Sequence, residues 1–129
     1  LPITMHGLDV THKALMGLAE ADRLDALGTR VGRVFADLLR FFTRFHVEKY
    51  GTADTPIHDA VAVAHAALPG LVTTRRYHVD VETNGDITRG RTVVDDRGQP
   101  GEPPNVDVAL DIDRAAFADL VVEAVASYR

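Results

Sequence analysis

The strongest pattern in the sequence is a run of apolar residues that recur every three or four positions between Thr29 and Gly51. This spacing predicts a long amphipathic helix, with charged residues largely on its other face. The Thr29 hydroxyl is suited to cap the start of the helix, and Gly51 is suited to end it after Tyr50. The apolar face consists of Val31, Val34, Phe35, Leu38, Phe41, Phe42 and Phe45.

Shorter patterns precede this helix. Residues 1–10 predict an extended segment, and residues 22–27 predict a short helical piece that stops at Gly28. Between them, Thr11 predicts the cap of a short helix whose apolar residues are Ala14, Leu15 and Leu18.

A second clear helix follows the long one. After a loop over residues 52–57, this helix opens at His58 and is terminated by Pro69 and Gly70. Its residues are apolar on nearly every side, so we expect the helix to be buried.

Beyond residue 70 the period changes from helical to alternating. Tyr77, Val79 and Val81 alternate with polar residues, which predicts a half-buried strand. The dipeptide 84–85, Asn-Gly, predicts a tight hairpin turn, with the return strand over residues 87–94.

The remaining segments complete the pattern. Residues 97–105 are rich in proline and glycine and predict a loop, and residues 106–112 alternate as a strand. Asp113 then predicts the cap of a final amphipathic helix with Phe117, Leu120, Val121 and Val125 on its apolar face. The expected fold class is α/β: an open sheet with helices followed by a hairpin, a further strand and a C-terminal helix. This order resembles the second half of an α/β fold, because no complete strand–helix alternation is present.

Composition narrows the function classes. A chain of 129 residues is long enough for one domain with a hydrophobic core. The net charge of −5 and the lack of a basic stripe argue against a nucleic-acid partner. No apolar run is long enough to cross a bilayer, and without cysteine there is no disulfide framework or thiolate metal site. We expect a cytoplasmic protein with no membrane partner.

The candidate chemistry centres on the adjacent residues His58 and Asp59. They follow a proline turn and open an apolar helix, where free backbone N–H groups and a partial positive charge gather. There, an imidazole can donate a proton and a carboxylate can bind a cation. On local chemistry alone, the alternative is simpler: Asp59 stabilises the helix start and His58 packs on the turn.

The other polar candidates are weaker. The six histidines show no standard metal-ligand spacing, and we interpret His65 as a hydrogen-bonded core histidine. His46 fits a helix-surface position and a pocket-lining position equally well. Asp95 and Asp96 border the Gly/Pro-rich loop and are interpreted as a solvated strand end, while capping explains Asp113.

Four segments in the same order give a resemblance that covers essentially the whole chain. They are Leu8-Asp9-Val10-Thr11-His12, then Tyr50-Gly51 followed by Ile57-His58-Asp59-Ala60, then Gly90-Arg91-Thr92-Val93-Val94-Asp95, and finally residues 104–117. Together they resemble the C-terminal part of the inosine-uridine preferring nucleoside hydrolases.

The resemblance implies an activity and residue roles. Members of this family hydrolyse the N-glycosidic bond of ribonucleosides with an active-site Ca²⁺. His58 would be the proton donor to the leaving base, and Asp59 a ligand of the Ca²⁺. Phe42, His46 and Tyr50 would approach the base side of the substrate.

The chain also departs from the family pattern. The family's Asp-rich N-terminal segment, which supplies most Ca²⁺ ligands, has no counterpart here, and family members are much longer. We therefore expect residues 1–129 to form a single partial domain, the C-terminal part of a nucleoside hydrolase, inactive alone and prone to homo-oligomerise through exposed apolar surface. The alternative is a non-catalytic binding or oligomerisation domain that retains this half of the fold.

Overall fold

The computed structural model describes residues 1–98 and 102–128. In chain order its elements are β1 (Thr4–Met5), α1 (Leu8–Thr11), β2 (Leu15–Met16), α2 (Leu18–Asp25), α3 (Arg30–Tyr50), β3 (Thr55–Pro56), α4 (His58–Ala67), the 3₁₀ turn η1 (Pro69–Leu71), β4 (Val72–Val81), β5 (Thr92–Asp95), β6 (Val106–Ile112) and α5 (Arg114–Ala126).

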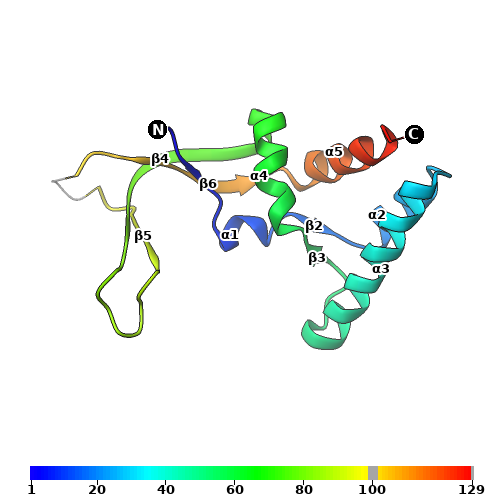
Figure 1. Cartoon of the computed structure of the whole chain (residues 1–129), viewed down its shortest axis with the longest axis horizontal. Helices are drawn as coiled ribbons and strands as arrows, with labels where there is room; N and C mark the ends of the chain where they lie inside the picture. Colours follow the sequence, from blue (N-terminus) through cyan, green and yellow to red (C-terminus); the bar gives the residue numbers. More distant parts are fainter. Residues whose placement is uncertain (99–101, 129) are drawn as a thin grey trace.

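The main sheet is open and mixed, as the α/β expectation required. Within the described residues its strand order is β1-β6-β4-β5, with β1 parallel to β6 and the other pairs antiparallel. Figure 1 shows the β4–β5 arm reaching away from the rest of the molecule. A separate two-stranded ladder joins β2 to β3.

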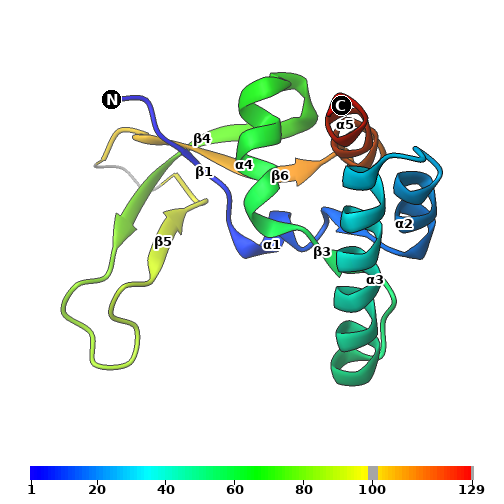
Figure 2. The same ribbon diagram turned by 45° about the vertical axis from the view of Figure 1, so that its right-hand side comes forward.

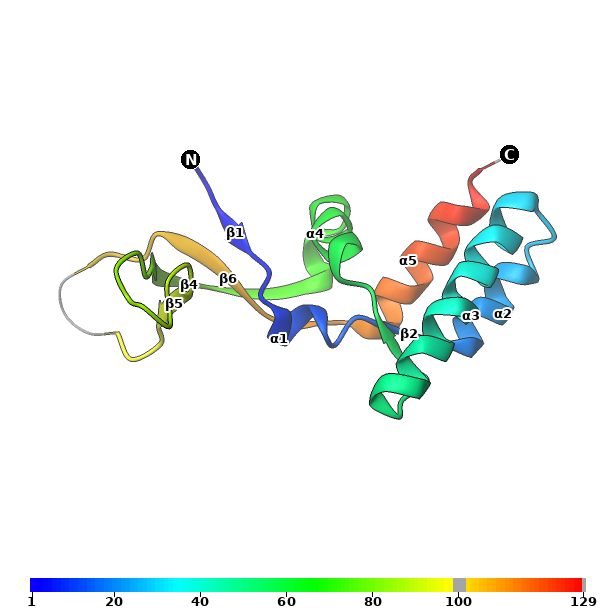
Figure 3. The same cartoon turned by 60° about the horizontal axis from the view of Figure 1, so that its bottom comes forward.

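Three helices pack together at the end of the molecule opposite that arm. Figure 2 shows α2, α3 and α5 side by side, and Figure 3 shows how this helical end and the β4–β5 arm give the chain an elongated shape. The core between these helices includes Leu24, Ala36 and Phe117, all of them buried. The α4 helix lies between the two ends, close to α1 and the sheet.

The long helix α3 confirms the sequence prediction at both ends. The Thr29 hydroxyl accepts a hydrogen bond from the Gly32 N–H at 3.0 Å, and Gly51 ends the helix with a φ of 71°. Gly32 is needed for close packing, because a Cβ there would lie 2.5 Å from the Leu24 carbonyl oxygen of α2.

The predicted apolar face of α3 is largely exposed. The residues that α3 buries are Gly32, Ala36, Leu39 and Thr43. The neighbouring stripe remains open to solvent, and its members are Val34, Phe35, Leu38, Phe41, Phe42 and Phe45. We call these six residues the α3 apolar stripe.

Two local helix predictions were wrong. Thr11 does not cap a helix: it is the last residue of α1, and Leu15–Met16 form the strand β2. The partner strand of β2 lies far away in the sequence, because β2 pairs with β3. The expected burial of α4 was also wrong, since only Val61 and Ala64 are buried and Val63 is 72% exposed.

The prediction of a tight hairpin turn at residues 84–85 was also wrong. The last strand pair joins Val81 to Thr92, so the connection is much longer than two residues. The Glu82 carboxylate accepts hydrogen bonds from the N–H groups of Asn84 and Gly85, which lowers its pKa and holds a different turn. No described non-glycine residue has a positive φ, as the expected turn would require of Asn84.

The C-terminal predictions were confirmed. Residues 106–112 form β6, and the Asp113 carboxylate accepts a hydrogen bond from the Ala116 N–H to cap α5. The expected loop over 97–105 has no regular structure where it is described, and residues 99–101 lie outside the described residues. Among the described residues, no helix is both long and apolar enough to cross a bilayer.

Candidate active site

The start of α4 is fixed by a backbone clamp. Leu15 pairs with Pro56 and Met16 with Thr55 across the β2–β3 ladder, and the Ile57 N–H donates to the Ala14 carbonyl at 2.9 Å. The clamp ends one residue before His58. It therefore holds His58 at a set position beside the C-terminal end of α1.

Two side chains from the α1 region contact the His58 ring. Thr11 Oγ1 and His58 Nδ1 share a hydrogen bond of 2.7 Å. The ring of His12 meets the His58 ring edge-to-face, with centroids 4.9 Å apart and planes at 85°. His12 is itself held, because its Nδ1–H donates to the Leu8 carbonyl at 2.6 Å.

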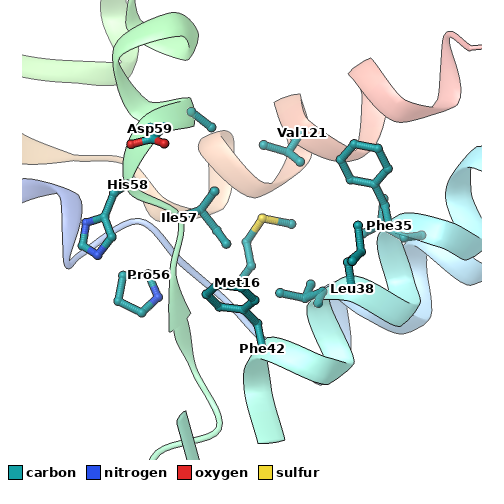
Figure 4. Close-up of a pocket in the computed structure, with 12 residues that line it drawn as sticks. Met16, Phe35, Leu38, Phe42, Pro56, Ile57, His58, Asp59 and Val121 are labelled. Carbon is teal, nitrogen blue, oxygen red and sulfur yellow. The ribbon is translucent and has the colours of Figure 1, made fainter. Parts of the chain in front are cut away.

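His58 and Asp59 lie at the margin of an apolar cavity of about 500 Å³. Figure 4 shows them at the start of α4, with Ile57 and Met16 between them and the side chains of α3. The remaining lining comes mainly from α3, α2 and α5: Leu24, Phe35, Leu38, Leu39, Phe42, Pro56, Ala60 and Val121. A cavity with apolar walls and polar groups at one side is the usual form of a small-molecule site.

Asp59 is exposed in the first turn of α4. The N-cap of α4 is Ile57, which makes no side-chain cap, and Asp59 is the acidic residue of the first turn, where its charge suits the helix start. No group of three or more potential metal-ligating side chains occurs among the described residues. Ca²⁺ needs about six to eight oxygen ligands, so these residues do not by themselves fit a calcium site.

The three predicted base-contacting residues form a chain of rings along α3. Phe42 lines the cavity with His58 and Asp59. His46 stacks on Phe42 at 6.3 Å, and Tyr50 packs on His46 at 5.1 Å, which places His46 and Tyr50 successively further along the helix. The structure therefore brings Phe42 to the cavity wall and leaves His46 and Tyr50 outside its lining.

His65 is separate from this site. Its Nδ1 lies 2.9 Å from His6 Nε2, so it is hydrogen-bonded as predicted, although it is half-buried. Burial, and then the charge of His65, lower the pKa of His6. His65 therefore has a structural partner of its own, two turns from His58.

From the sequence, Thr11 was expected only to cap a short helix, and His12 had no predicted role. The available signal was their place in the segment 8–12, one of the four segments that carry the family resemblance. Their contact with His58 joins two of those segments in space.

Known proteins of one family resemble this chain in sequence. The family model described as inosine-uridine preferring nucleoside hydrolase matches residues 1–119. The chain is 43% identical to the pyrimidine-specific ribonucleoside hydrolase RihA of Citrobacter koseri and 42% identical to RihA of Escherichia fergusonii. These matches cover 99% of this chain but only 41% and 42% of those relatives.

Solved structures show the same fold. A purine-preferring ribonucleoside hydrolase from Gardnerella vaginalis matches with a TM-score of 0.83 and 31% identity, over 97% of this chain and 40% of that one. A plant nucleoside hydrolase, PpNRh1, matches with a TM-score of 0.79 at 22% identity, over 97% of this chain and 42% of that one. The chain thus spans about two fifths of the length of these relatives.

Proposed function

This chain belongs to the inosine-uridine preferring nucleoside hydrolase family, and we propose that it contributes the proton-donating side of an active site that hydrolyses ribonucleosides to free base and ribose. The observation that carries the proposal is the His58 ring, held by Thr11 at the margin of an apolar cavity. The ring is half-buried, so it can meet a ligand while one nitrogen stays bound to the protein.

The proposed chemistry follows from the bond that breaks. Hydrolysis adds water across the bond between the sugar C1′ and the base nitrogen, so the sugar gains a hydroxyl and the base gains a proton. A base departs more easily when it is protonated, and histidine exchanges protons near neutral pH. In this proposal His58 Nε2 donates the proton, because Nδ1 already bonds to Thr11.

We place the base beside α3. Phe42 offers an apolar ring on the cavity wall, and His46 and Tyr50 extend the aromatic surface away from it. Aromatic rings stack on nucleobases favourably. Since His46 and Tyr50 do not line the cavity, we propose that they contact the base only when a ligand or the rest of a family-length protein draws them inward.

Asp59 has a different proposed role. We propose that it supplies one carboxylate to a Ca²⁺ site whose other ligands lie beyond the described residues. One exposed carboxylate holds Ca²⁺ weakly. We therefore propose that the 129-residue chain alone is inactive and that activity needs a family-length protein.

A second candidate is a binding or oligomerisation domain without catalysis. The observation in its favour is the α3 apolar stripe, in which Phe41 is 61% exposed. Exposed apolar patches of this kind often mark protein–protein contacts. The same stripe supports our proposal that the isolated chain self-associates.

A chimera separates the two candidates. In the Citrobacter koseri RihA relative, these 129 residues would replace the segment that they match. We expect ribose release from uridine or inosine with Ca²⁺ by this chimera, and none by the 129-residue chain alone. Both nucleosides are needed, because the relatives include pyrimidine-specific and purine-preferring enzymes. A chimera that folds with the relative's melting behaviour but releases no ribose would favour the binding domain.

A further inference from the structure

We propose that Thr11 is a positioning residue for His58: its hydroxyl holds Nδ1 so that Nε2 is the nitrogen that exchanges protons. The structural part of this inference stands on the contacts of the two side chains. Its catalytic consequence rests on the function proposed above. No sequence pattern near His58 points to Thr11, since 47 residues separate them.

The burial of Thr11 makes the contact specific. Thr11 is 5% exposed, so its hydroxyl has little access to water. Among the described residues, the side-chain hydrogen bond that Thr11 makes is the one to His58. Since a buried polar group without a partner destabilises a protein, this bond favours one orientation of the His58 ring.

Thr11 is also fixed from the backbone side. The N–H groups of Val10 and Thr11 donate to the Gly7 carbonyl, both at 3.1 Å, and the Thr11 carbonyl accepts from the Ala14 N–H at 3.2 Å. Val10, next to Thr11, is fully buried. The Ala14 carbonyl in turn accepts from Ile57, so the Thr11 and His58 segments form one connected unit.

A hydroxyl suits this position because it serves both proton states of the ring. It accepts from Nδ1–H when His58 is protonated, and it continues to accept from Nδ1–H after Nε2 has given up its proton. The ring can therefore give up a proton from Nε2 without losing its partner. A carboxylate in the same place would instead favour the charged ring and raise its pKa.

His12 limits the remaining motion of the ring. Its edge-to-face contact at 4.9 Å lies beside the Thr11 bond, and its own bond to the Leu8 carbonyl requires a proton on Nδ1. A turn of the His58 ring would break the Thr11 bond and meet His12. His58 is thus held by one directional bond and one steric contact.

The test uses NMR of the ¹⁵N-labelled 129-residue chain, which needs no activity. Long-range ¹H–¹⁵N spectra report which ring nitrogen of His58 carries the proton and whether Nδ1 accepts a hydrogen bond. We expect the neutral wild-type ring to carry its proton on Nδ1, hydrogen-bonded to Thr11, with Nε2 unprotonated. Thr11→Val should move the Nδ1 shift toward that of an unbonded ring, and Thr11→Ser should keep the wild-type shift.

A matched control is present in the chain. Thr43 is also a buried threonine, and its hydroxyl bonds to Thr55 at 3.4 Å rather than to a histidine. Thr43→Val removes the same group and should leave the His58 shifts unchanged. Identical His58 ring shifts in the wild type and Thr11→Val would overturn the proposal, as would an equal change in Thr43→Val.

The effect of Thr11 on catalysis is measured as kcat and KM of the RihA chimera. We expect Thr11→Val to lower kcat about tenfold with little change in KM, since a misplaced catalytic group commonly costs this much or more. Thr11→Ser should recover most of the rate. If His58→Ala retains the full rate, the proposed function fails even where NMR supports the Thr11 contact. If His58→Ala loses the rate and a folded Thr11→Val does not, the positioning role fails alone.

Discussion

His6 Nε2 and His65 Nδ1 lie 2.9 Å apart and link the segment after β1 to the last turn of α4. One ring must donate and the other accept, so the bond is lost when both rings are protonated. Burial first, and then the charge of His65, lower the pKa of His6 below its ordinary value of 6.5.

This pair predicts that acid destabilises the fold. Because the pKa of His6 is lower in the folded chain, the unfolded chain binds more protons just below pH 6.5. The free energy of unfolding should therefore decrease as the pH falls through and below that value. Urea unfolding at several pH values measures it, and His6→Gln should show a flatter dependence.

His78 provides a control with the opposite sign. Its hydrogen bond to the Pro103 carbonyl, and then its contact with Asp80, raise its pKa. Its stabilising contribution is present at low pH and is lost as the pH rises through the raised pKa. His78→Gln should therefore steepen the acid loss of stability, and a flatter curve in that variant would contradict the assignment.

The close approach of α2 and α3 predicts a steric effect at Gly32. Gly32→Ala places a Cβ 2.5 Å from the Leu24 carbonyl oxygen, so the two helices must separate. We expect a loss of about 1–3 kcal/mol in the free energy of unfolding, despite the better helix propensity of alanine. Gly70→Ala, where a Cβ meets nothing within 4 Å, is the matched control. An unchanged or raised unfolding midpoint for Gly32→Ala would show that the helices are not this close.

The α3 apolar stripe predicts self-association of the isolated chain. Replacing Leu38 and Phe41 by glutamate removes exposed apolar surface and introduces like charges, so the mass measured by light scattering should fall to that of a monomer. Val63→Glu, at a site on α4 that is 72% exposed, should leave the association intact. A wild-type chain that is monomeric at all concentrations tested would refute this prediction.

Sequence alone predicted the elements that carry local signals. Thr29 and Gly51 mark the two ends of α3 in the sequence, and Asp113 marks the start of α5. These caps act within three or four residues, so no distant partner can override them easily.

The sequence predictions failed where a distant or competing partner determines the local structure. The Glu82 carboxylate takes the amides of Asn84 and Gly85, which changes the turn. The apolar pattern of α4 cannot indicate how many of its sides will meet the protein. In the candidate site, His58 and Asp59 were found from their adjacency, whereas the contact of His58 with Thr11 depends on the β2–β3 clamp.

His58 is proposed to donate a proton to the departing base. Comparing a nucleoside with a substrate whose leaving group needs no proton tests this role directly. In the RihA chimera, His58→Ala should lower kcat on uridine or inosine by about 10²-fold or more, within the usual range for general acid catalysis. The same variant should hydrolyse 4-nitrophenyl riboside nearly as fast as the chimera that keeps His58, because nitrophenolate leaves without a proton. Equal losses on both substrates, or no loss on the nucleoside, would contradict the account.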